Sequence, residues 1–337
     1  MTPPARFLDQ LGRPLGDLRV SVTDRCNFRC RYCMPRESFG TEHAFLPRSE
    51  LLSFEEVTRL VRVLGGAVRK VRLTGGEPLL RKDVAQLIAM LKREASVEVA
   101  LTTNGVLLPK LAAALASAGL ERLTVSLDAL DDAVFRAVTD ADYGVSDVLA
   151  GIDSAVRAGF ERVKVNCVVR RGLNESQILP LARHFHGTPH VLRFIEYMDV
   201  GATNGWRSQQ VLSAAEIVEL IDRELPLEAT PRTQGSDVAE RYRYRDGGGE
   251  IGVIASVTRP FCGDCTRLRL SADGQLFTCL FAAFGSDIRG PLRSGASDPE
   301  LHELVRRIWE RRADRYSELR AEQIVPRRRL EMSYLGG

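Results

Sequence analysis

Two cysteine triplets hold six of the seven cysteines in this 337-residue chain. Their members are, near the start, Cys26, Cys30 and Cys33 and, near the end, Cys262, Cys265 and Cys279. Four-iron clusters are normally held by four cysteines and structural zinc by four ligands, so each triplet is one protein donor short. An iron atom without a protein ligand can bind a small molecule directly. The triplets therefore predict two open metal sites, one for a cofactor and one for a substrate.

The first triplet has the spacing C-x3-C-x2-C, with Tyr32 directly before its last cysteine. This spacing fits neither the C-x2-C-x2-C run of bacterial ferredoxins nor the paired C-x2-C hooks of zinc sites. A three-cysteine zinc loop with a remote fourth ligand is the alternative. The segment Thr74–Pro78, with Gly75, Gly76 and Glu77 at its centre, follows an expected strand. By itself it would be a plain turn, but after such a cysteine loop it predicts a ligand-binding loop where the backbone approaches its ligand.

Short runs rich in β-branched residues alternate with amphipathic stretches along the first two hundred residues. The expected strands are Leu18–Thr23, Lys70–Thr74, Val97–Thr102, Arg122–Leu127, Val163–Val169 and Val191–Ile195. The expected helices between them are Phe54–Leu64, Val84–Glu94, Leu107–Ala118, Val145–Ala158 and Glu175–Phe185. This alternation predicts an α/β fold with parallel strands joined by right-handed crossovers. Periodicity leaves open whether the strands form an incomplete barrel or an open doubly wound sheet.

The connection from Thr23 to Lys70 is much longer than the later ones and holds the first triplet, which indicates a functional insertion at the C-terminal end of a strand. After Met198 the alternation stops. A loop, a helix at Ala214–Arg223, a hairpin turning at Gly247-Gly248-Gly249 and the second triplet follow, with a further helix around Pro299–Arg312. We expect one domain over residues 1–205 and a smaller α+β domain over residues 206–337.

Several cations fall within expected strands, where charged side chains are rare unless they meet a ligand. Arg267 and Arg269 alternate onto one strand face beside the second triplet. They could be a solvent-facing pair on an edge strand, but Arg19, Arg72 and Lys164 also lie within strands. Five cations around one cavity would suit a triphosphate.

Composition excludes several classes of protein. With 47 Lys and Arg against 44 Asp and Glu, the net charge of +3 does not indicate a general nucleic-acid binder. No apolar run is long enough for a membrane span, and the N-terminus lacks a signal sequence. An odd number of cysteines favours metal or redox chemistry in a reducing, cytoplasmic setting over a disulfide framework. The seventh, Cys167, is expected to be a small buried hydrophobic residue.

Together these motifs resemble one family, the GTP 3′,8-cyclases of molybdenum-cofactor biosynthesis, which are radical S-adenosylmethionine enzymes. The resemblance extends over nearly the whole chain, from about Leu18 to Gly337. It implies an incomplete (β/α)6 TIM-like barrel with a smaller C-terminal cluster-binding domain. The segments that carry it are CNFRCRYC, VRLTGGEP, LTTNG, VSLD, RFIEYM, FCGDCTRLRLS and the Gly-Gly end.

The resemblance also implies a role for individual residues. Each cysteine triplet would hold one [4Fe-4S] cluster, the first binding S-adenosylmethionine and the second the guanine base of GTP. Cofactor contacts would come from Tyr32, Gly76, Glu77, Ser126 and Met198. GTP contacts would come from Arg19, Arg72, Thr102, Lys164, Arg267, Leu268 and Arg269. The expected catalytic residues are Arg267, Arg269, Gly336 and Gly337, because the family's terminal glycine pair is thought to reach the active site.

In such an enzyme a deoxyadenosyl radical removes the ribose 3′ hydrogen of GTP, and the C3′ radical attacks C8 of guanine. Reduction then gives 3′,8-cyclo-7,8-dihydro-GTP, the first intermediate of molybdopterin biosynthesis. The implied partners are an external electron donor, a cyclic pyranopterin monophosphate synthase that receives the product, and a second copy of the chain in a homodimer.

Other functions stay open on the residues alone. A peptide-modifying radical enzyme would share the barrel, although its auxiliary-cluster domain usually carries more than three cysteines. A radical enzyme for another nucleotide would use the same cations, and only the family resemblance selects GTP. A non-catalytic electron-transfer or zinc-stabilised binding protein would instead have fully ligated metals and no use for the Gly75–Pro78 segment.

Overall fold

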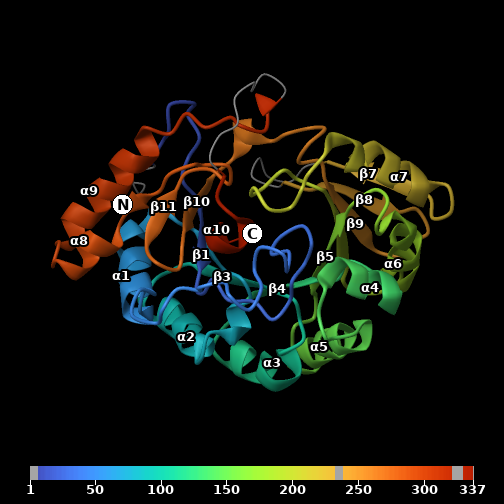
Figure 1. Ribbon diagram of the computed structural model, residues 1–337, viewed down its shortest axis with the longest axis horizontal. Helices are drawn as coiled ribbons and strands as arrows, with labels where there is room; N and C mark the ends of the chain where they lie inside the picture. The colour runs from blue at the N-terminus through green and yellow to red at the C-terminus, as the bar shows by residue number, and fades with distance from the viewer. Residues whose placement is uncertain (1–6, 232–237, 321–328, 337) are drawn as a thin grey trace.

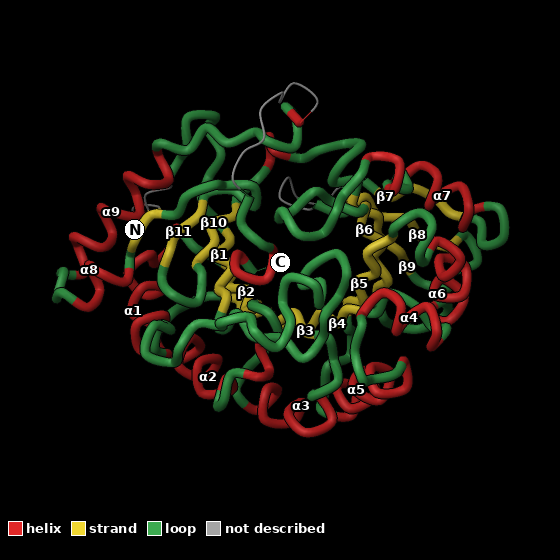
Figure 2. The backbone as a smooth tube through the Cα atoms, in the orientation of Figure 1, coloured by secondary structure: helices red, strands yellow, loops and turns green. Residues whose placement is uncertain are grey.

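The structure is a computed structural model that describes residues 7–231, 238–320 and 329–336. These residues form one twelve-stranded sheet with the strand order β12-β11-β10-β1-β2-β3-β4-β5-β6-β9-β8-β7. The sheet bends into an arc, and all the longer helices lie outside it (Figures 1 and 2). The six central strands, which pair in parallel, are β1 (Asp17–Ser21), β2 (Lys70–Thr74), β3 (Glu98–Thr103), β4 (Arg122–Ser126), β5 (Lys164–Val169) and β6 (Val191–Glu196).

The helices between these strands agree with the predicted ones to within about three residues. They are α1 (Phe54–Leu64), α2 (Val84–Glu94), α3 (Leu108–Ser117), α5 (Val145–Arg157) and α6 (Ile178–Phe185). Helix α1 begins where it does because Ser53 and Glu56 form a capping box that satisfies two backbone N–H groups. A sixth helix, α4 (Asp132–Thr139), is absent from the sequence-based prediction and is important for the first cysteine loop.

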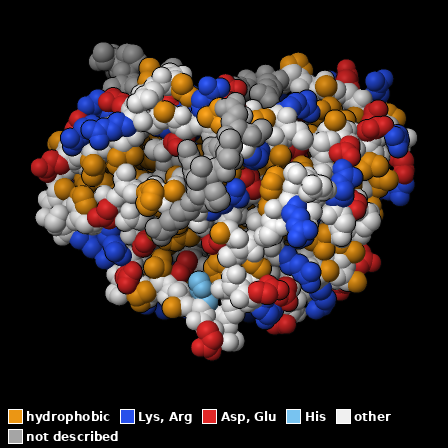
Figure 3. All heavy atoms as spheres, turned by 45° about the horizontal axis from the view of Figure 1, so that its top comes forward, with side chains coloured by type: hydrophobic (Ala, Val, Ile, Leu, Met, Phe, Trp, Pro, Cys, Tyr) orange, Lys and Arg blue, Asp and Glu red, His pale blue; other side chains and the backbone are white. Residues whose placement is uncertain are grey.

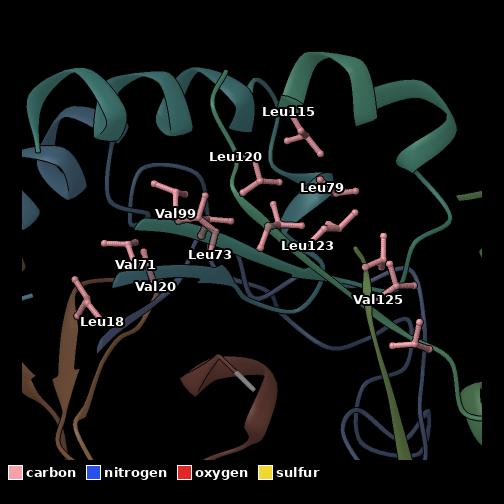
Figure 4. Close-up of a cluster of buried hydrophobic side chains, with 14 of the residues drawn as sticks. Leu18, Val20, Val71, Leu73, Leu79, Val99, Leu115, Leu120, Leu123 and Val125 are labelled. Atoms are coloured by element: carbon pink, nitrogen blue, oxygen red, sulfur yellow. The ribbon is translucent and has the colours of Figure 1, made fainter. Parts of the chain in front are cut away.

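The main core lies between the outer face of the arc and these helices. Figure 4 shows Leu115 of α3 pointing toward the sheet, and Leu123 and Val125 of β4 belong to the same buried cluster. Each of these three side chains is at most 1% exposed. Burying one such side chain contributes about 1.5–3 kcal/mol, so the apolar outer face fixes which strand residues point inward. The inward positions are therefore free to carry polar side chains.

The C-terminal part adds strands to both edges of the barrel sheet. β7 (Leu227–Thr230), β8 (Glu240–Tyr244) and β9 (Glu250–Ile254) extend it beyond β6, and β9 pairs in parallel with β6. β10 (Arg267–Leu270), β11 (Gln275–Phe277) and β12 (Ser286–Asp287) extend it beyond β1, with which β10 pairs in parallel. The remaining helices are α7 (Ala214–Asp222), α8 (Arg289–Arg293), α9 (Asp298–Glu310) and α10 (Met332–Leu335).

Helix α10, unlike the others, lies in the hollow of the arc beside the C-terminus (Figure 1). The domain boundary expected between residues 205 and 206 stays a prediction. Strands β7 to β12, which follow it in the chain, belong to the same sheet as the barrel strands. Acidic and basic side chains are interspersed on the face in Figure 3. In the described ranges, no helix combines the length and apolar character needed to cross a bilayer.

Candidate active site

The first cysteine triplet lies in the loop between β1 and α1, and helix α4 holds this loop in place. Backbone N–H groups of Arg29 and Arg31 donate to the carbonyl oxygens of Thr139 and Val138, at 2.9 and 3.0 Å. These carbonyls belong to the last turn of α4, which has no intrahelical partners for them. The unpredicted helix therefore serves as a docking site for the backbone on either side of Cys30.

The Gly75-Gly76 segment packs against the same loop. The N–H groups of Gly76 and Glu77 donate to the carbonyls of Thr23 and Arg25, both at 2.8 Å. A Cβ atom on Gly76 would lie 2.3 Å from the oxygen of Arg25, a distance that excludes every side chain. The sequence analysis explained these glycines by approach to a ligand. The structure adds that they bring the end of β2 against the chain leading to Cys26.

Glu77 joins the ends of two strands. Its carboxylate accepts hydrogen bonds from the backbone N–H groups of Leu79 and Asn104, at 3.0 and 2.7 Å, and from the Thr103 hydroxyl at 2.8 Å. Burial raises its pKa to about 7. Asn104 in turn donates to the side-chain oxygen of Asn27 at 2.7 Å. Glu77 therefore positions the loops around the expected cofactor site, and sequence reasoning missed its partner Asn104.

Tyr32 donates a hydrogen bond to the carboxylate of Asp128 at 2.9 Å. Asp128 follows β4 and also accepts from the N–H of Val168 at 2.8 Å; burial raises its pKa to about 6. Ser126, the last residue of β4, and Met198, just after β6, line the same cavity. Asp128 was not among the predicted site residues, although it closes the VSLD motif.

The three thiols of the first triplet are poorly suited to remain as free thiolates. Burial raises the pKa of Cys26 to about 12 and those of Cys30 and Cys33 well above their ordinary value. A bound cationic iron core would compensate this cost. In the described part of the chain, no three His, Cys, Asp or Glu side chains form a group suited to one metal ion. A four-iron cluster binds its cysteines through different iron atoms, so the donor set fits a cluster.

The second triplet flanks β10 and β11: Cys262 and Cys265 precede β10, and Cys279 follows β11. Cys265 lies two residues before the start of β10. Its pKa falls to about 6 because Arg267 and Arg312 outweigh the effect of burial. Burial raises the pKa of Cys279 to about 11, although the N–H of Phe281 lies 3.4 Å from its sulfur. Two of these cysteines are therefore in contrasting electrostatic surroundings. The donor set again fits a cluster with three protein ligands.

Three neighbouring strands place a row of arginines on the inner face, which we call the arginine row: Arg269 of β10, Arg19 of β1 and Arg72 of β2. Arg19 is in register with both of the others. Burial and repulsion from Arg269 lower the pKa of Arg19 well below its ordinary value, and burial and repulsion from Arg267 lower that of Arg269 to about 10. Such mutual repulsion is relieved when an anion binds between the cations.

The arginine row continues into polar groups of the next strands. Arg72 donates to the hydroxyls of Thr102 and Thr124, at 3.1 and 3.3 Å, and Thr124 is in register with Lys164. Arg193 and Arg241, which the sequence analysis missed, also line the cavity. The signal was present for Arg193, because it lies within a predicted strand as Arg19 does.

One cavity of about 820 Å³ is lined by all six triplet cysteines, by the arginine row and by Lys164. It is also lined by seven further expected cofactor and GTP residues, namely Tyr32, Gly76, Glu77, Ser126, Met198, Thr102 and Arg267. The strand pairing brings these residues together from segments more than two hundred positions apart. The arrangement can hold an anionic ligand between two metal centres.

Three predicted residues stand apart from this cavity. Leu268 is fully buried in the core on the opposite strand face, so its side chain cannot contact a ligand in the lumen, and only its backbone can. Gly336 does not line the cavity but accepts a hydrogen bond from Arg269, and Gly337 lies outside the described residues. Cys167 is 1% exposed in the core, as predicted.

Comparison with known proteins identifies the family. Residues 20–185 match the Radical SAM superfamily, and residues 190–318 match Molybdenum Cofactor Synthesis C. A protein named GTP 3′,8-cyclase from Acidothermus cellulolyticus is 53% identical over 364 residues, covering 100% of both chains. Another of that name, from Xanthomonas axonopodis pv. citri, is 50% identical over 341 residues with the same coverage. The chain belongs to the GTP 3′,8-cyclase family.

Solved structures agree on the fold. The crystal structure of Streptococcus suis SuiB bound to S-adenosylmethionine matches 94% of this chain and 76% of its own, with a TM-score of 0.63 and 14% identity. The incomplete TIM-like barrel with a C-terminal extension is therefore confirmed, as is the family resemblance. As a GTP 3′,8-cyclase family member, the chain is a radical enzyme that uses S-adenosylmethionine and iron–sulfur clusters.

Proposed function

We propose that the cavity binds S-adenosylmethionine at the Cys26, Cys30 and Cys33 end and GTP along the arginine row. The enzyme then converts GTP to (8S)-3′,8-cyclo-7,8-dihydroguanosine 5′-triphosphate. The observation that carries this proposal is one lumen shared by both triplets and by a set of mutually repelling cations. The triphosphate of GTP would relieve that repulsion. The GTP molecule would then have its guanine base toward the second triplet and its ribose toward the first.

The chain's own residues would position the reactants. Arg19, Arg72 and Lys164 would bind phosphate oxygens, because guanidinium and ammonium groups make strong charge-assisted hydrogen bonds to them. Tyr32, Gly76, Ser126 and Met198 would contact S-adenosylmethionine, and Glu77 would hold the loops around it. When bound, the N-terminal cluster and S-adenosylmethionine supply the radical that removes a hydrogen atom from the ribose. Holding the ribose at that point is the main task of the protein.

At the other end of the cavity, Cys262, Cys265 and Cys279 would hold the second cluster beside the guanine base. Arg267 and Arg269 would lie next to the reacting nucleotide, and Gly336 would approach it through Arg269. Gly337, also expected to be catalytic, lies outside the described residues. Leu268 would contribute through its backbone alone. The arginines could also supply the proton that completes the product.

The direct test is anaerobic incubation of the reconstituted protein with GTP, S-adenosylmethionine and a strong reductant, followed by mass analysis of the nucleotide. Two four-iron clusters require about eight irons and eight sulfides per chain, with deoxyadenosine released as GTP is consumed. Zinc without sulfide would instead support a non-catalytic binding protein. Equal turnover of ATP would favour another nucleotide substrate.

A variant separates substrate binding from cofactor cleavage. Arg267→Ala should weaken GTP binding in anaerobic equilibrium dialysis while uncoupled cleavage of S-adenosylmethionine continues. Arg243→Ala, at an exposed position of β8, is the matched control and should bind GTP like the unmodified protein. Unchanged GTP affinity in Arg267→Ala would contradict the assigned role.

The partners complete the proposal. An external donor would reduce the clusters, and the product would pass to a cyclic pyranopterin monophosphate synthase. The family resemblance supports a homodimer. A cytoplasmic location would suit six cysteines that must stay reduced for cluster assembly.

A further inference from the structure

A buried cluster of charged side chains lies beside the second triplet, outside every motif in the sequence. Asp9, Arg13 and Arg312 form it, and we call it the Arg–Asp–Arg triad. Their side chains are 0%, 3% and 2% exposed. The Asp9 carboxylate accepts from Arg13 Nε at 2.6 Å and from Arg312 Nη1 at 3.1 Å. The triad thus joins the N-terminal segment to the end of α9, about three hundred residues later in the chain.

The two guanidiniums hold the backbone of all three cysteine segments. Arg13 Nη1 donates to the carbonyl of Cys262 at 2.7 Å. Arg312 Nη1 donates to the carbonyl of Cys265 at 2.7 Å, and its Nε donates at 2.9 Å to the carbonyl of Thr278, which precedes Cys279. The Asp9 carboxylate therefore holds two guanidinium groups in place. Together they set the spacing of the second triplet.

Trp309 makes this arrangement rigid. Its indole N–H donates to the carbonyl of Arg13 at 3.1 Å, and the guanidinium carbon of Arg312 lies 4.5 Å from its ring centroid. Trp309 itself is fully buried in the core. The geometry of the triad is therefore determined by packing and is available before any cluster binds.

The triad carries an excess of positive charge. Two guanidiniums face one carboxylate, and buried excess charge is costly unless an opposite charge lies nearby. Asp314 is a further carboxylate near Arg312, at 3.9 Å from its Nε, but it is partly exposed. Three thiolates outweigh the charge of an oxidised four-iron core, so a loaded second site is anionic and would compensate the excess.

We propose that Asp9, Arg13 and Arg312 are positioning residues for the C-terminal cluster. They preset the spacing of its three cysteine segments, and their net positive charge stabilises the anionic cluster. This inference rests on the proposed assignment of Cys262, Cys265 and Cys279 to a cluster. It assigns no direct contact with substrate to the triad.

The test uses the full-length, reconstituted holoenzyme with Arg312→Gln and Asp9→Asn. Arg312→Gln removes a positive charge and two carbonyl contacts; Asp9→Asn removes the negative charge. A more positive surrounding favours the reduced cluster. We therefore expect the reduction potential of the C-terminal cluster to fall in Arg312→Gln and to rise in Asp9→Asn. A merely structural role would not produce shifts of opposite sign.

A second readout is iron release to a chelator under anaerobic conditions. In Arg312→Gln about half of the iron, that of the C-terminal cluster, should leave at least fivefold faster, while uncoupled S-adenosylmethionine cleavage at the other cluster is unchanged. Arg311→Gln, the exposed neighbouring residue, is the matched control. If Arg312→Gln fails to fold, Arg312→Lys is the test, because it keeps the positive charge and loses the guanidinium hydrogen bonds. Iron release should then be faster, while the reduction potential of the C-terminal cluster stays near that of the unmodified protein.

The proposal would be overturned if folded Arg312→Gln released iron as slowly as the unmodified protein and kept its reduction potential. It would also be overturned if Arg312→Lys released iron no faster than the unmodified protein. Absence of the second cluster from the unmodified protein is a different result. That outcome would remove the proposed function itself, whereas failure of the triad would leave two clusters in place.

Discussion

Arg269 donates a hydrogen bond from Nη1 to the carbonyl oxygen of Gly336, 67 residues further along the chain. Gly336 has a φ of +73°, and a Cβ atom there would lie 2.2 Å from the hydroxyl oxygen of Thr74. Gly336 thus reaches the arginine row at a position that only glycine can occupy. Arg269 connects the tail with the site proposed for GTP.

Gly336→Ala should therefore lower turnover at least about tenfold. The added methyl group clashes with Thr74, and a left-handed backbone costs a non-glycine residue about 1–2 kcal/mol, so the tail moves away from Arg269. Product formation at saturating GTP measures the effect. Iron content should not change, because the atoms nearest to the added methyl group belong to Thr74 and Ser21 and not to a cysteine.

Gly295→Ala is the matched control for backbone strain. Gly295 also has a positive φ, +86°, but a Cβ atom there meets nothing within 4 Å. It should lose some stability and keep full turnover. Equal activity of both variants would show that the tail has no part in the reaction.

Arg19→Gln should have opposite effects on stability and on GTP binding. Arg19 lies between Arg269 and Arg72, and its removal relieves repulsion in the GTP-free holoenzyme, whose thermal midpoint should rise. Hydrogen bonds to charged groups contribute about 1.5–3 kcal/mol, and about 1.4 kcal/mol corresponds to tenfold in affinity. GTP binding should therefore weaken at least about tenfold in anaerobic dialysis.

Arg183→Gln, which removes an exposed cation from α6, should change neither quantity. A fall in the midpoint of Arg19→Gln would mean that Arg19 is compensated without any ligand. The arginine row would then be a structural feature of the barrel.

Local signals predicted much of the fold. The expected ranges Lys70–Thr74 and Phe54–Leu64 match β2 and α1 to the residue. Both depend on interactions between neighbours in the chain, which periodicity and capping rules describe. The cysteine spacings were equally local, and they predicted both triplets.

Contacts between distant segments could not be predicted in this way. Nothing near Asp9 indicates its pairing with Arg312, and nothing in Tyr32 indicates Asp128 as its partner. Such pairs depend on which strands are neighbours and in which register, and β10 pairs with β1 only because the chain returns to the first edge of the sheet. Leu268 illustrates the converse, since strand alternation already placed it on the face opposite Arg267 and Arg269.

Glu77 gives a prediction for pH. Its pKa is raised from an ordinary value of 4.5 to about 7, so the folded state binds this proton more tightly than the unfolded state. Its contribution to stability is complete below about pH 4.5 and is lost as the pH rises through about 7. Glu77→Gln carries no such proton, so its thermal midpoint should fall less than that of the unmodified protein between pH 6 and 8.

Glu77→Gln should also be less stable at every pH, because an amide nitrogen would face the N–H of Asn104. The informative quantity is therefore the slope of the midpoint with pH, measured on holoenzyme at one scan rate. Glu228→Gln, exposed on β7, should keep the slope of the unmodified protein. Parallel slopes for Glu77→Gln and the unmodified protein would mean that another group titrates in this range.

The seventh cysteine allows a test of how the metal is divided between the two triplets. Cys279→Ser should lose about four of eight irons per chain, those of the C-terminal cluster. The residues of β11, which precede Cys279, contain no cysteine that could replace it. Cys167→Ala removes a thiol that is buried in the core and belongs to neither triplet, so the iron content of this variant should stay at about eight. Iron and sulfide analysis after anaerobic reconstitution measures both.

Cys279→Ser should also keep uncoupled cleavage of S-adenosylmethionine, since the N-terminal triplet is intact and is held by α4 and the Gly75-Gly76 segment. Loss of all iron in this variant would indicate that the clusters assemble interdependently. Retention of all eight irons would mean that another donor replaces Cys279. Either result would require a different account of the second triplet, because each triplet is assigned a cluster of its own.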